Sequence, residues 1–458
     1  MWKSLLLLPL VPIAVAAQTA KVFTPLPDVQ PILGAVRAEL LPADLRDLDA
    51  SAREGRWPVW VARHDAEIRA RVAEGDADSI IHLLLFGTSF TSTPRASEQE
   101  LASLVTRPDE ALGMLRRRLD DFAAAVAAPG ANARVRHARE VIERQGIDPA
   151  TAGGPAALRR YLDERTSIVG GSVQSARALA PGADPTDTTT LFRQRGLSSD
   201  TSIFIDFGVE QALDAMKVAG ALRANSVRRV AIVGPGLDFI DKLDGYDFYP
   251  EQTVQPFALI DSLLRFELAE ADRLEVVAFD VSARVVQHLE AARTRARAGS
   301  SYTVVLPRNV DRPWSPELVD YWARLGNWIG EPAARAPVAP PNAGRVDVRA
   351  AAVRPSVVAS VMPFDLNIVT ERVAPPGAPF DLIVATNVLI YYDVFDQSVA
   401  IANIGAMLRP GGVLLTNTRI IELPESPLTS LGRLDVGYMT LPGIGQTGDR
   451  FAWYRRSG

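Results

Sequence analysis

The segment that decides the fold runs from Pro379 to Arg419 and reads PFDLIVATNVLIYYDVFDQSVAIANIGAMLRPGGVLLTNTR. It contains two apolar runs, Phe380 to Asn387 and Gly412 to Asn417, and each ends in a polar residue. An aromatic turn, a helical pattern and LRPGG lie between them. Continuous apolar runs that alternate with helices are typical of parallel strands buried on both faces. The segment therefore predicts a strand–helix–strand unit of a parallel sheet.

Two further apolar runs lie upstream, and a helical pattern precedes them. The runs are VRRVAIVG, from Val227 to Gly234, and RLEVVAFD, from Arg273 to Asp280, and we expect the helix from Val209 to Arg223. This alternation predicts a doubly wound α/β domain over residues 207–458. Residues from about 300 to 344, with three Trp and the stretch EPAARAPVAPP, are expected to form an insertion that acts as a lid or as a wall of the acceptor site.

The region before this domain has a helical pattern. From residue 22 to 180, apolar residues recur at intervals of three and four, with charged residues between them. We expect helices at Glu98–Arg107, Asp109–Val126, Val135–Arg144 and Ala156–Glu164, with breaks at Gly75, Pro94, Pro129–Gly130 and Gly153–Pro155. Residues 181–206, rich in Pro, Gly, Asp and Thr, are expected to connect this helical domain to the α/β domain.

The first seventeen residues have the pattern of a secretory signal peptide. Lys3 is followed by an apolar run from Leu5 to Val15, and Ala14, Ala16 and Ala17 provide an A-x-A cleavage site. The run contains two Pro and is shorter than the ~20 apolar residues that a membrane span needs. We therefore expect a bacterial export signal, a periplasmic or secreted mature chain and no stable membrane span. The alternatives are an uncleaved N-terminal anchor and a start codon placed too early on a cytoplasmic protein.

Composition excludes several classes of function. The chain has 49 Lys+Arg against 54 Asp+Glu, a formal net charge of −5, so we expect no nucleic-acid partner. It has no Cys, which excludes thiolate metal sites and a Cys nucleophile. The four His lack the spacing of metal ligands, and we expect no metal.

Two of the predicted strands end in residues suited to ligand binding. Gly234-Pro235-Gly236 forms a turn that a ligand can approach closely, and Asp280 can accept hydrogen bonds from a ribose or cap the next helix. A nicotinamide-dependent dehydrogenase is disfavoured, because Phe239 replaces the third glycine of its fingerprint and Asp280 lies 44 residues after Gly236. A serine hydrolase is disfavoured because GTSFTS, from Gly87 to Ser92, lacks the glycine two residues after the serine.

The segment from Pro379 to Arg419 resembles the class I S-adenosylmethionine-dependent methyltransferases, and within them the chemotaxis-receptor glutamate methyltransferases. The likeness lies in FDLI, NVLIYY and L-x-PGG. It extends to PFDLNIVTE, from Pro363 to Glu371, and to GYMTL and DRFAWYRR between Gly437 and Arg456. The resemblance implies a Rossmann-like class I methyltransferase domain, a mostly parallel sheet with a C-terminal antiparallel hairpin, preceded by a helical N-terminal domain.

The resemblance also implies S-adenosylmethionine as the cofactor and names its binding residues. Gly234 and Gly236 would lie against the methionine part of the cofactor, and Asp280 would bind the ribose. Asp365 and Leu366 match the position that flanks the adenine in that family.

Asn387 and Tyr391 would face the methyl group and the acceptor as catalytic residues, and Asn387 would also contact the cofactor. The implied acceptor is a carboxyl or hydroxyl group of a small molecule or a protein. Three aromatic residues would either line the acceptor side or pack in the core: Tyr246, Tyr249 and Trp322.

The chain departs from the family at several positions. Ile232 stands where the family has an acidic residue, and Asp238 where it has a small one. Arg193 and Arg195 are the candidates for binding the cofactor's carboxylate. These departures, and the cytosolic origin of S-adenosylmethionine, leave an alternative: an exported, non-catalytic module that keeps the fold and binds another ligand or partner.

Overall fold

The computed structural model describes residues 20–95, 108–178, 196–237, 244–374, 379–421, 423, 426–441 and 445–458. Within these ranges, no helix combines the length and the apolar character needed to cross a bilayer. The predicted signal peptide at residues 1–17 lies outside them, as do the predicted helix at Glu98–Arg107 and most of the predicted connector.

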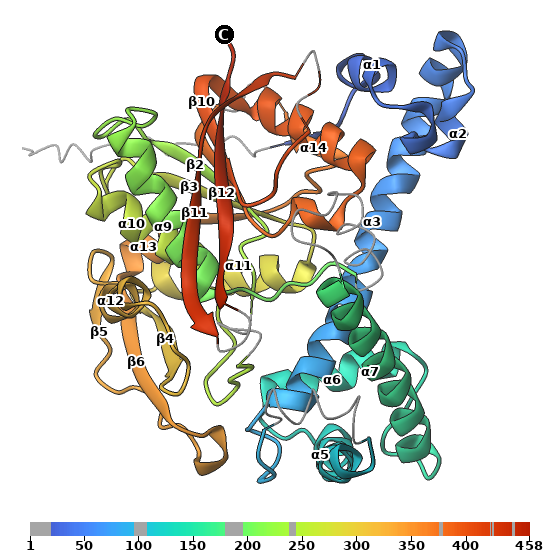
Figure 1. Ribbon diagram of the computed structural model, residues 1–458, viewed down its shortest axis with the longest axis vertical. Helices are drawn as coiled ribbons and strands as arrows, with labels where there is room; N and C mark the ends of the chain where they lie inside the picture. The colour runs from blue at the N-terminus through green and yellow to red at the C-terminus, as the bar shows by residue number, and fades with distance from the viewer. Residues whose placement is uncertain are drawn as a thin grey trace, which may run out of the picture.

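A seven-stranded sheet forms the centre of the molecule, in the order β11-β12-β10-β9-β2-β3-β7 (Figure 1). Its strands are β2 (Arg229–Val233), β3 (Glu275–Asp280), β7 (Val361–Asp365), β9 (Phe380–Ala385), β10 (Leu408–Thr416), β11 (Leu428–Leu441) and β12 (Gly445–Arg456). The five strands from β7 to β10 run parallel, whereas β12 pairs antiparallel with both β10 and β11. The four strands predicted from apolar runs are confirmed, and the fold is α/β and Rossmann-like.

Helices cover both faces of this sheet, because its central strands are apolar on both sides. Along β2, Val230 and Ile232 join one core while Ala231 and Val233 join the other. The first core contains buried residues of α9 (Ile203–Val218), α10 (Gln255–Arg265), α11 (Ala283–Arg297) and α13 (Pro355–Ser360). The second contains residues of α14 (Val394–Met407) and Ile68 of a long N-terminal helix.

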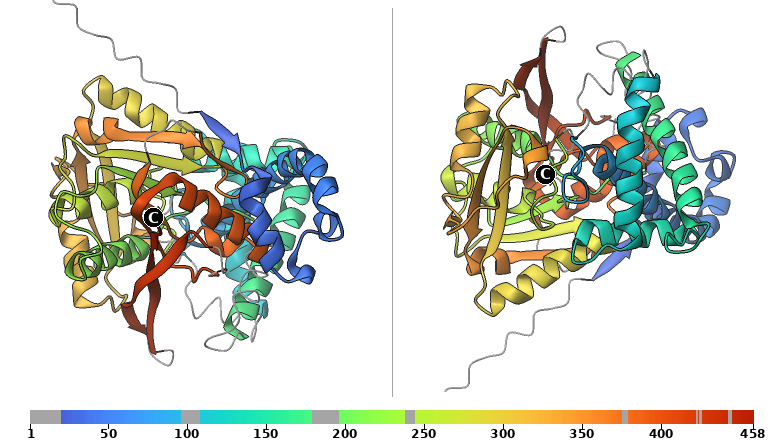
Figure 2. Two further views of the ribbon diagram at one scale, coloured as in Figure 1. Left: turned by 90° about the horizontal axis from the view of Figure 1, so that it is seen from above. Right: turned by 90° about the horizontal axis from the view of Figure 1, so that it is seen from below.

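The N-terminal region is mainly helical and lies beside the α/β domain (Figure 2). Its elements are β1 (Lys21–Phe23), α1 (Leu26–Ala35), a 3₁₀ turn (Ala38–Leu40), α2 (Ala43–Arg46), α3 (Ala50–Phe86), α5 (Pro108–Ala127), α6 (Ala133–Arg144) and α7 (Gly154–Ala178). β1 pairs antiparallel with β8 (Glu371–Val373), far along the chain. Three of the predicted helices are confirmed as α5, α6 and α7.

The prediction that Gly75 interrupts a helix is wrong, because Gly75 lies inside the 37-residue helix α3. The absence of a side chain at Gly75 allows two segments of the chain to lie in close contact. A Cβ at Gly75 would lie 1.8 Å from the carbonyl oxygen of Leu197. The backbone amide of Leu197 in turn donates to the Arg71 carbonyl at 3.0 Å. Gly75 therefore permits the segment after the connector to lie directly on α3.

The insertion is a small separate sheet and is longer than predicted. It consists of β4 (Tyr302–Asn309), α12 (Pro316–Arg324), β5 (Gly330–Pro332), a 3₁₀ turn (Pro341–Ala343) and β6 (Val346–Val353). The strands pair antiparallel in the order β4-β6-β5. In Figure 1 this sheet lies below α10 and α13.

Candidate functional site

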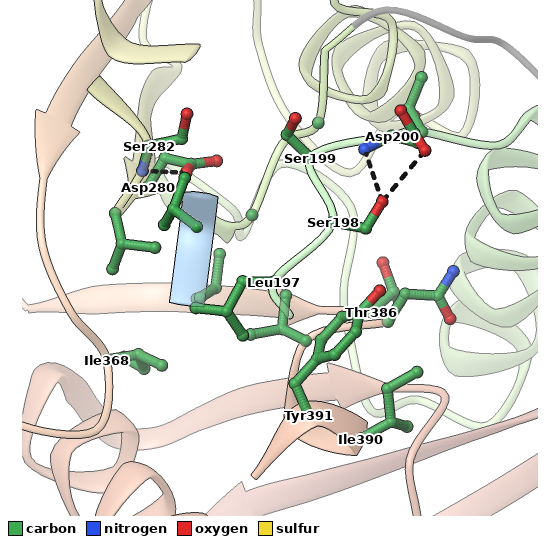
Figure 3. Close-up of a pocket in the computed structure, with 18 of the residues that line it drawn as sticks. Leu197, Ser198, Ser199, Asp200, Asp280, Ser282, Ile368, Thr386, Ile390 and Tyr391 are labelled. Carbon is green, nitrogen blue, oxygen red and sulfur yellow. Dashed lines mark hydrogen bonds between the residues drawn. The ribbon is translucent and has the colours of Figure 1, made fainter. Parts of the chain in front are cut away.

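A cavity of about 300 Å³ opens at the carboxyl ends of β2, β3 and β9 (Figure 3). The chain leaves β2 toward β3 on one side and returns to β9 on the other, so the cavity lies where the strand order reverses. In open α/β sheets this is the place where ligands bind. Its lining includes Val72, Asp78, Leu197, Ser198, Asp200, Gly234, Gly236, Asp280, Leu366, Asn387 and Tyr391.

Both glycines of the predicted turn line the cavity. Gly234 and Gly236 have φ of +67° and +73°, a left-handed backbone that favours glycine. A Cβ at Gly236 would lie 2.8 Å from Cβ of Thr201. The next amide, of Leu237, donates to the Ser199 carbonyl at 2.5 Å. The turn therefore lets the segment of residues 196–202 close one side of the cavity.

Asp280 is the last residue of β3 and lines the cavity, and it also accepts a hydrogen bond from the turn before the next helix. Its Oδ1 accepts a hydrogen bond from the Ser282 amide at 2.7 Å, directly before α11. The residue is 9% exposed, and burial raises the pKa of its carboxyl group to about 7, with a smaller contribution from the charge of Asp365. Asp280 therefore lines the cavity as predicted, but it stabilises the turn before α11 rather than capping that helix, whose N-cap residue is Ser282.

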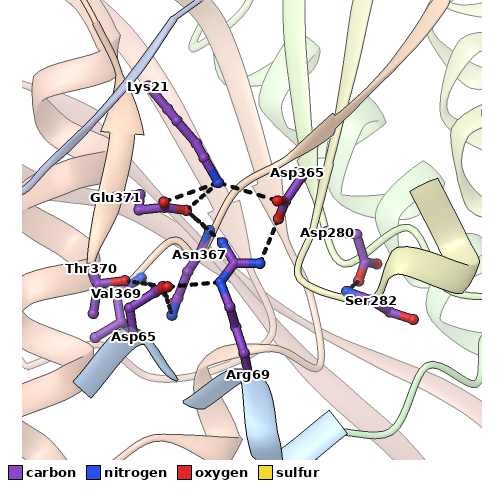
Figure 4. Close-up of polar contacts among 10 residues, drawn as sticks. All are labelled: Lys21, Asp65, Arg69, Asp280, Ser282, Asp365, Asn367, Val369, Thr370 and Glu371. Carbon is purple, nitrogen blue, oxygen red and sulfur yellow. Dashed lines mark hydrogen bonds and ion pairs between the residues drawn. The ribbon is translucent and has the colours of Figure 1, made fainter. Parts of the chain in front are cut away.

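Asp365 does not line the cavity, in contrast to the prediction from resemblance. Figure 4 shows that it instead contacts Lys21 and Arg69 of the N-terminal region. Its carboxylate pairs with Arg69 of α3 at 2.6 Å and with Lys21 of β1 at 3.2 Å. The same two cations also bind Glu371. Asp365 stands beside Asp280 at the ends of paired strands, where two carboxylates would repel each other. The cations from the N-terminal region relieve this repulsion, and only Leu366 of the predicted pair lines the cavity.

Asn387 lines the cavity and has a partner that the sequence analysis missed. Its φ is +56°, so the chain turns sharply after β9 into a 3₁₀ turn at Leu389–Tyr391. The Asn387 amide donates to the Asn417 side-chain oxygen at 2.8 Å, and the Asn417 side chain donates back at 2.7 Å. The sequence contains a signal for this pair, because the same dipeptide stands at the end of both strands: Thr386-Asn387 at β9 and Thr416-Asn417 at β10.

Tyr391 lines the cavity and is held by α3. The Arg71 guanidinium donates to the Tyr391 carbonyl at 2.7 Å, while the Arg71 carbonyl accepts from the Leu197 amide. Figure 3 shows Tyr391, Leu197 and Ser198 around the same part of the cavity. One residue of α3 therefore fixes two walls of the cavity that come from distant parts of the chain.

Two acidic residues of the cavity were also missed. Asp78 of α3 is 1% exposed and lines the cavity together with Asp200. The hydroxyl groups of Ser79 and Ser198 each donate to Asp200 at 3.1 Å. Among the described residues that line the cavity there is no Lys, Arg or His. The sequence contains the polar stretch SSD at residues 198–200 of the predicted connector. The partner of Asp200 on α3, Ser79, lies 121 residues earlier in the chain, so a local pattern does not show this pairing.

The aromatic residues considered for the acceptor side pack elsewhere. Tyr246 and Tyr249 are 2% and 3% exposed and lie under the guanidinium groups of Arg95 and Arg134. Trp322 donates to the Leu306 carbonyl at 2.9 Å within the insertion. None of these three lines the cavity, and no residue of 300–353 does. The insertion is therefore neither a lid nor a wall of this cavity.

The remaining predictions concern departures from the family pattern. Ile232 is fully buried in the core of the sheet, which explains an apolar side chain there. Asp238, Phe239, Arg193 and Arg195 lie outside the described residues. Within the described part of the chain, no group of three or more His, Asp or Glu is arranged to hold a metal ion.

No protein-family model matches this sequence, and no curated protein matches it. Solved structures do match. Several of them are methyltransferases. The N-methyltransferase NodS from Bradyrhizobium japonicum is 14% identical, with 55% of this chain and 96% of that chain covered and a TM-score of 0.27. Magnesium protoporphyrin IX methyltransferase from Synechocystis, solved with bound S-adenosylmethionine, is 12% identical, with 55% and 79% covered and a TM-score of 0.26. A TehB-like S-adenosylmethionine-dependent methyltransferase from Corynebacterium glutamicum is 11% identical, with 55% and 88% covered and a TM-score of 0.23.

Proposed function

We propose that this protein is an S-adenosylmethionine-dependent methyltransferase. The observation that carries the proposal is the cavity at the strand-order reversal, with a glycine turn on β2 and a carboxylate at the end of β3. The sheet, five parallel strands closed by an antiparallel hairpin, supports it, because this is the arrangement that the sequence resemblance implies.

The charge of the cavity favours this cofactor over a nicotinamide dinucleotide. Asp78, Asp200 and Asp280 line it, and no Lys, Arg or His does so among the described residues. A pyrophosphate would be repelled by Asp200 and by the ionised form of Asp280, whereas Asp78 lies 3.8 Å from the imidazole of His82. S-adenosylmethionine carries a sulfonium and an ammonium group against a single carboxylate, so its net charge is positive and fits the cavity.

The residues present fit such a cofactor. Asp280 is held by a backbone amide behind it and can accept from ribose hydroxyls, and the apolar side chain of Leu366 can cover the adenine. The left-handed turn at Gly234 and Gly236 leaves room for the methionine part.

When bound, the cofactor supplies a methyl group on a positively charged sulfur. Displacement at such a group needs little covalent assistance, so holding the acceptor in line and excluding water can provide most of the catalysis. Asn387 and Tyr391 are the residues placed to do this, with Asn417 fixing the first and Arg71 the second. The proposed acceptor is a hydroxyl or carboxyl group of a small molecule or protein.

The proposed location is outside the cytoplasm, by way of the predicted signal at residues 1–17. An exported methyltransferase would need a source of S-adenosylmethionine beyond the cytosol. The second candidate function, a non-catalytic binding module, is favoured by Ile232, since a buried apolar residue replaces the family's acidic one.

Calorimetric titration with S-adenosylmethionine and S-adenosylhomocysteine tests the proposal. We expect micromolar binding that weakens by about tenfold or more in Asp280→Asn, because charge-assisted hydrogen bonds to the ribose are lost. Since the pKa of Asp280 is raised to about 7, binding should strengthen as the pH rises through 7. Asp347→Asn, at a surface ion pair with Arg308, is the control. No binding at millimolar ligand would exclude the methyltransferase and leave the binding module.

A further inference from the structure

A histidine of α3 lies in the contact between the N-terminal region and the α/β domain. The Nε2 atom of His64 is 2.8 Å from Oδ1 of Asp396, in the first turn of α14, and its Nδ1 atom is 3.3 Å from Oε2 of Glu67. The imidazole also stacks on Trp60, with ring centroids 4.6 Å apart. Trp60 in turn packs edge-on against Phe395, the neighbour of Asp396. Both nitrogens of this histidine therefore face carboxylates.

This geometry suits the protonated form of the His64 ring. A neutral imidazole has one N–H group, so one of its two nitrogens would present a lone pair to a carboxylate. The imidazolium donates from both nitrogens, and the face of Trp60 attracts its charge. The side chain of Asp396 is only 4% exposed, and a buried carboxylate is costly without a compensating positive charge. Protonation of His64 therefore strengthens the contact between α3 and α14.

The charged groups around this imidazole are mostly acidic. Asp396 and Glu67 face the ring, and Asp393 accepts a hydrogen bond from the Asp396 amide at 3.0 Å. Arg63, the residue before the histidine, is a cation, but it pairs with Glu67 at 3.2 Å and with Asp44 of α2. The surroundings therefore favour a positive charge on the ring.

The effect of these neighbours on the titration of His64 has a definite sign. Burial lowers the pKa of His64, but the hydrogen bonds and charges of Asp396 and Glu67 together raise this pKa above its ordinary value of 6.5. A group whose pKa is raised by folding stabilises the folded state fully below its unfolded pKa, and this contribution is lost as the pH rises through the folded pKa. The contact is therefore strong in mild acid and weaker in mild alkali.

The same two segments also form a wall of the cavity. Arg71, two turns after His64 on α3, donates to the carbonyl of Tyr391, five residues before Asp396. Tyr391 lines the cavity, and the turn that contains it leads directly into α14. Because α3 binds the segment of residues 391–396 at both of its ends, loosening one contact weakens the hold on the other.

We propose that His64 is a positioning residue whose protonation locks α3 against the start of α14 and thereby holds the Tyr391 wall of the cavity in place. When the ring loses its proton, it keeps one hydrogen bond and loses the other together with its charge. Residues 391–398 then open more often, as a local unfolding event. This inference goes beyond the proposed function and does not depend on which ligand the cavity takes.

Native-state hydrogen exchange of the full-length protein at about pH 5.5 and about pH 8.5 tests the inference, because the two values lie on either side of the expected titration. Protection factors of the amides in residues 391–398 are divided by those in β9, a buried central strand whose amides report global opening. This relative protection should fall by about three- to tenfold at the higher pH, since a charge-assisted hydrogen bond becomes neutral or is lost.

Two substitutions show whether His64 causes this fall. His64→Gln keeps a neutral donor but cannot gain a proton, so its relative protection should stay at the high-pH level of the unaltered protein under both conditions. His288→Gln is the matched control, because His288 lies on α11 and bonds the Tyr302 hydroxyl at 2.8 Å. It should retain the pH dependence.

A third variant tests the pairing directly. In Asp396→Asn the charge that faces His64 is removed, so the pKa of His64, followed by NMR of its ring protons, should fall. The inference is overturned if the relative protection of residues 391–398 is the same at both pH values or if His64→Gln keeps the pH dependence. It is also overturned if the His64 ring titrates below 6.5 in the unaltered protein or is unaffected by Asp396→Asn.

The measurements on the unaltered protein decide the question even if a variant does not fold. They use no ligand, so a failure to bind S-adenosylmethionine would count against the proposed function and leave this inference standing.

Discussion

Replacing Gly75 by Ala should damage the cavity while adding a helix-favouring residue. In an unobstructed helix, Gly→Ala stabilises by about 1 kcal/mol. At Gly75, however, the new Cβ would lie 1.8 Å from the Leu197 carbonyl oxygen, 2.3 Å from its carbon and 2.9 Å from the Ser198 amide nitrogen. These are backbone atoms, so residues 196–202 must retreat by roughly 1.5 Å to restore ordinary contact distances.

The retreat has two expected effects. Overpacking costs about 1–3 kcal/mol, so the net loss of unfolding free energy should be about 0–2 kcal/mol after the helix gain is subtracted. Displacement of a wall by about 1 Å can reduce activity ~100-fold, and we expect affinity for S-adenosylhomocysteine to fall by at least about tenfold. Urea unfolding measures the first effect, and calorimetric titration measures the second.

Gly55→Ala is the matched control, because Gly55 lies in the same helix and a Cβ there would meet nothing within 4 Å. It should raise the free energy of unfolding by up to about 1 kcal/mol and leave affinity unchanged. The reasoning is refuted if Gly75→Ala behaves like Gly55→Ala in both measurements.

Three other changes test separate contacts. Arg71→Met removes the donor to the Tyr391 carbonyl and should lower affinity for S-adenosylhomocysteine about tenfold by calorimetry; unchanged affinity would contradict this role. Asp247→Ala removes the acceptor of the Thr88 and Ser89 amides and should cost about 2–3 kcal/mol in urea unfolding, whereas Asp347→Ala should cost less than about 1 kcal/mol. Burial raises the pKa of Asp206, whose carboxylate oxygens have no hydrogen-bond partner, to about 8; the folded state therefore binds a proton that the unfolded state lacks, and stability falls as pH rises from about 4 to 8. Asp206→Asn should make the free energy of unfolding fall less as the pH rises. An unchanged pH profile of stability would refute the role of Asp206 in this dependence.

The sheet could be predicted because its signal is local. Strands buried on both faces need continuous apolar runs, and the runs at β2, β3, β9 and β10 are visible without any knowledge of their partners. The strand ends then place Gly234, Asp280 and Asn387 at one edge, which is why these predicted residues meet in the cavity.

The walls of the cavity that come from α3 and residues 196–202 could not be predicted from local patterns, because they depend on contacts between distant segments of the chain. Gly75 has the local signature of a helix break, and only the approach of Leu197 explains why it lies within a helix. Asp365 was predicted from a resemblance to flank the adenine, but its carboxylate pairs with Arg69, 296 residues earlier in the chain, and does not line the cavity. Local patterns contain no information about such pairings.

The pairing of β1 with β8 has a consequence for how the chain folds. Lys21 binds Glu371 across 350 positions, so the first strand has no partner until that part of the chain has left the ribosome. Contacts across such separations form slowly, because closing a long loop restricts the chain before any contact compensates it. Strand β1 is therefore expected to be made long before β8 and to be among the last segments to reach its native place.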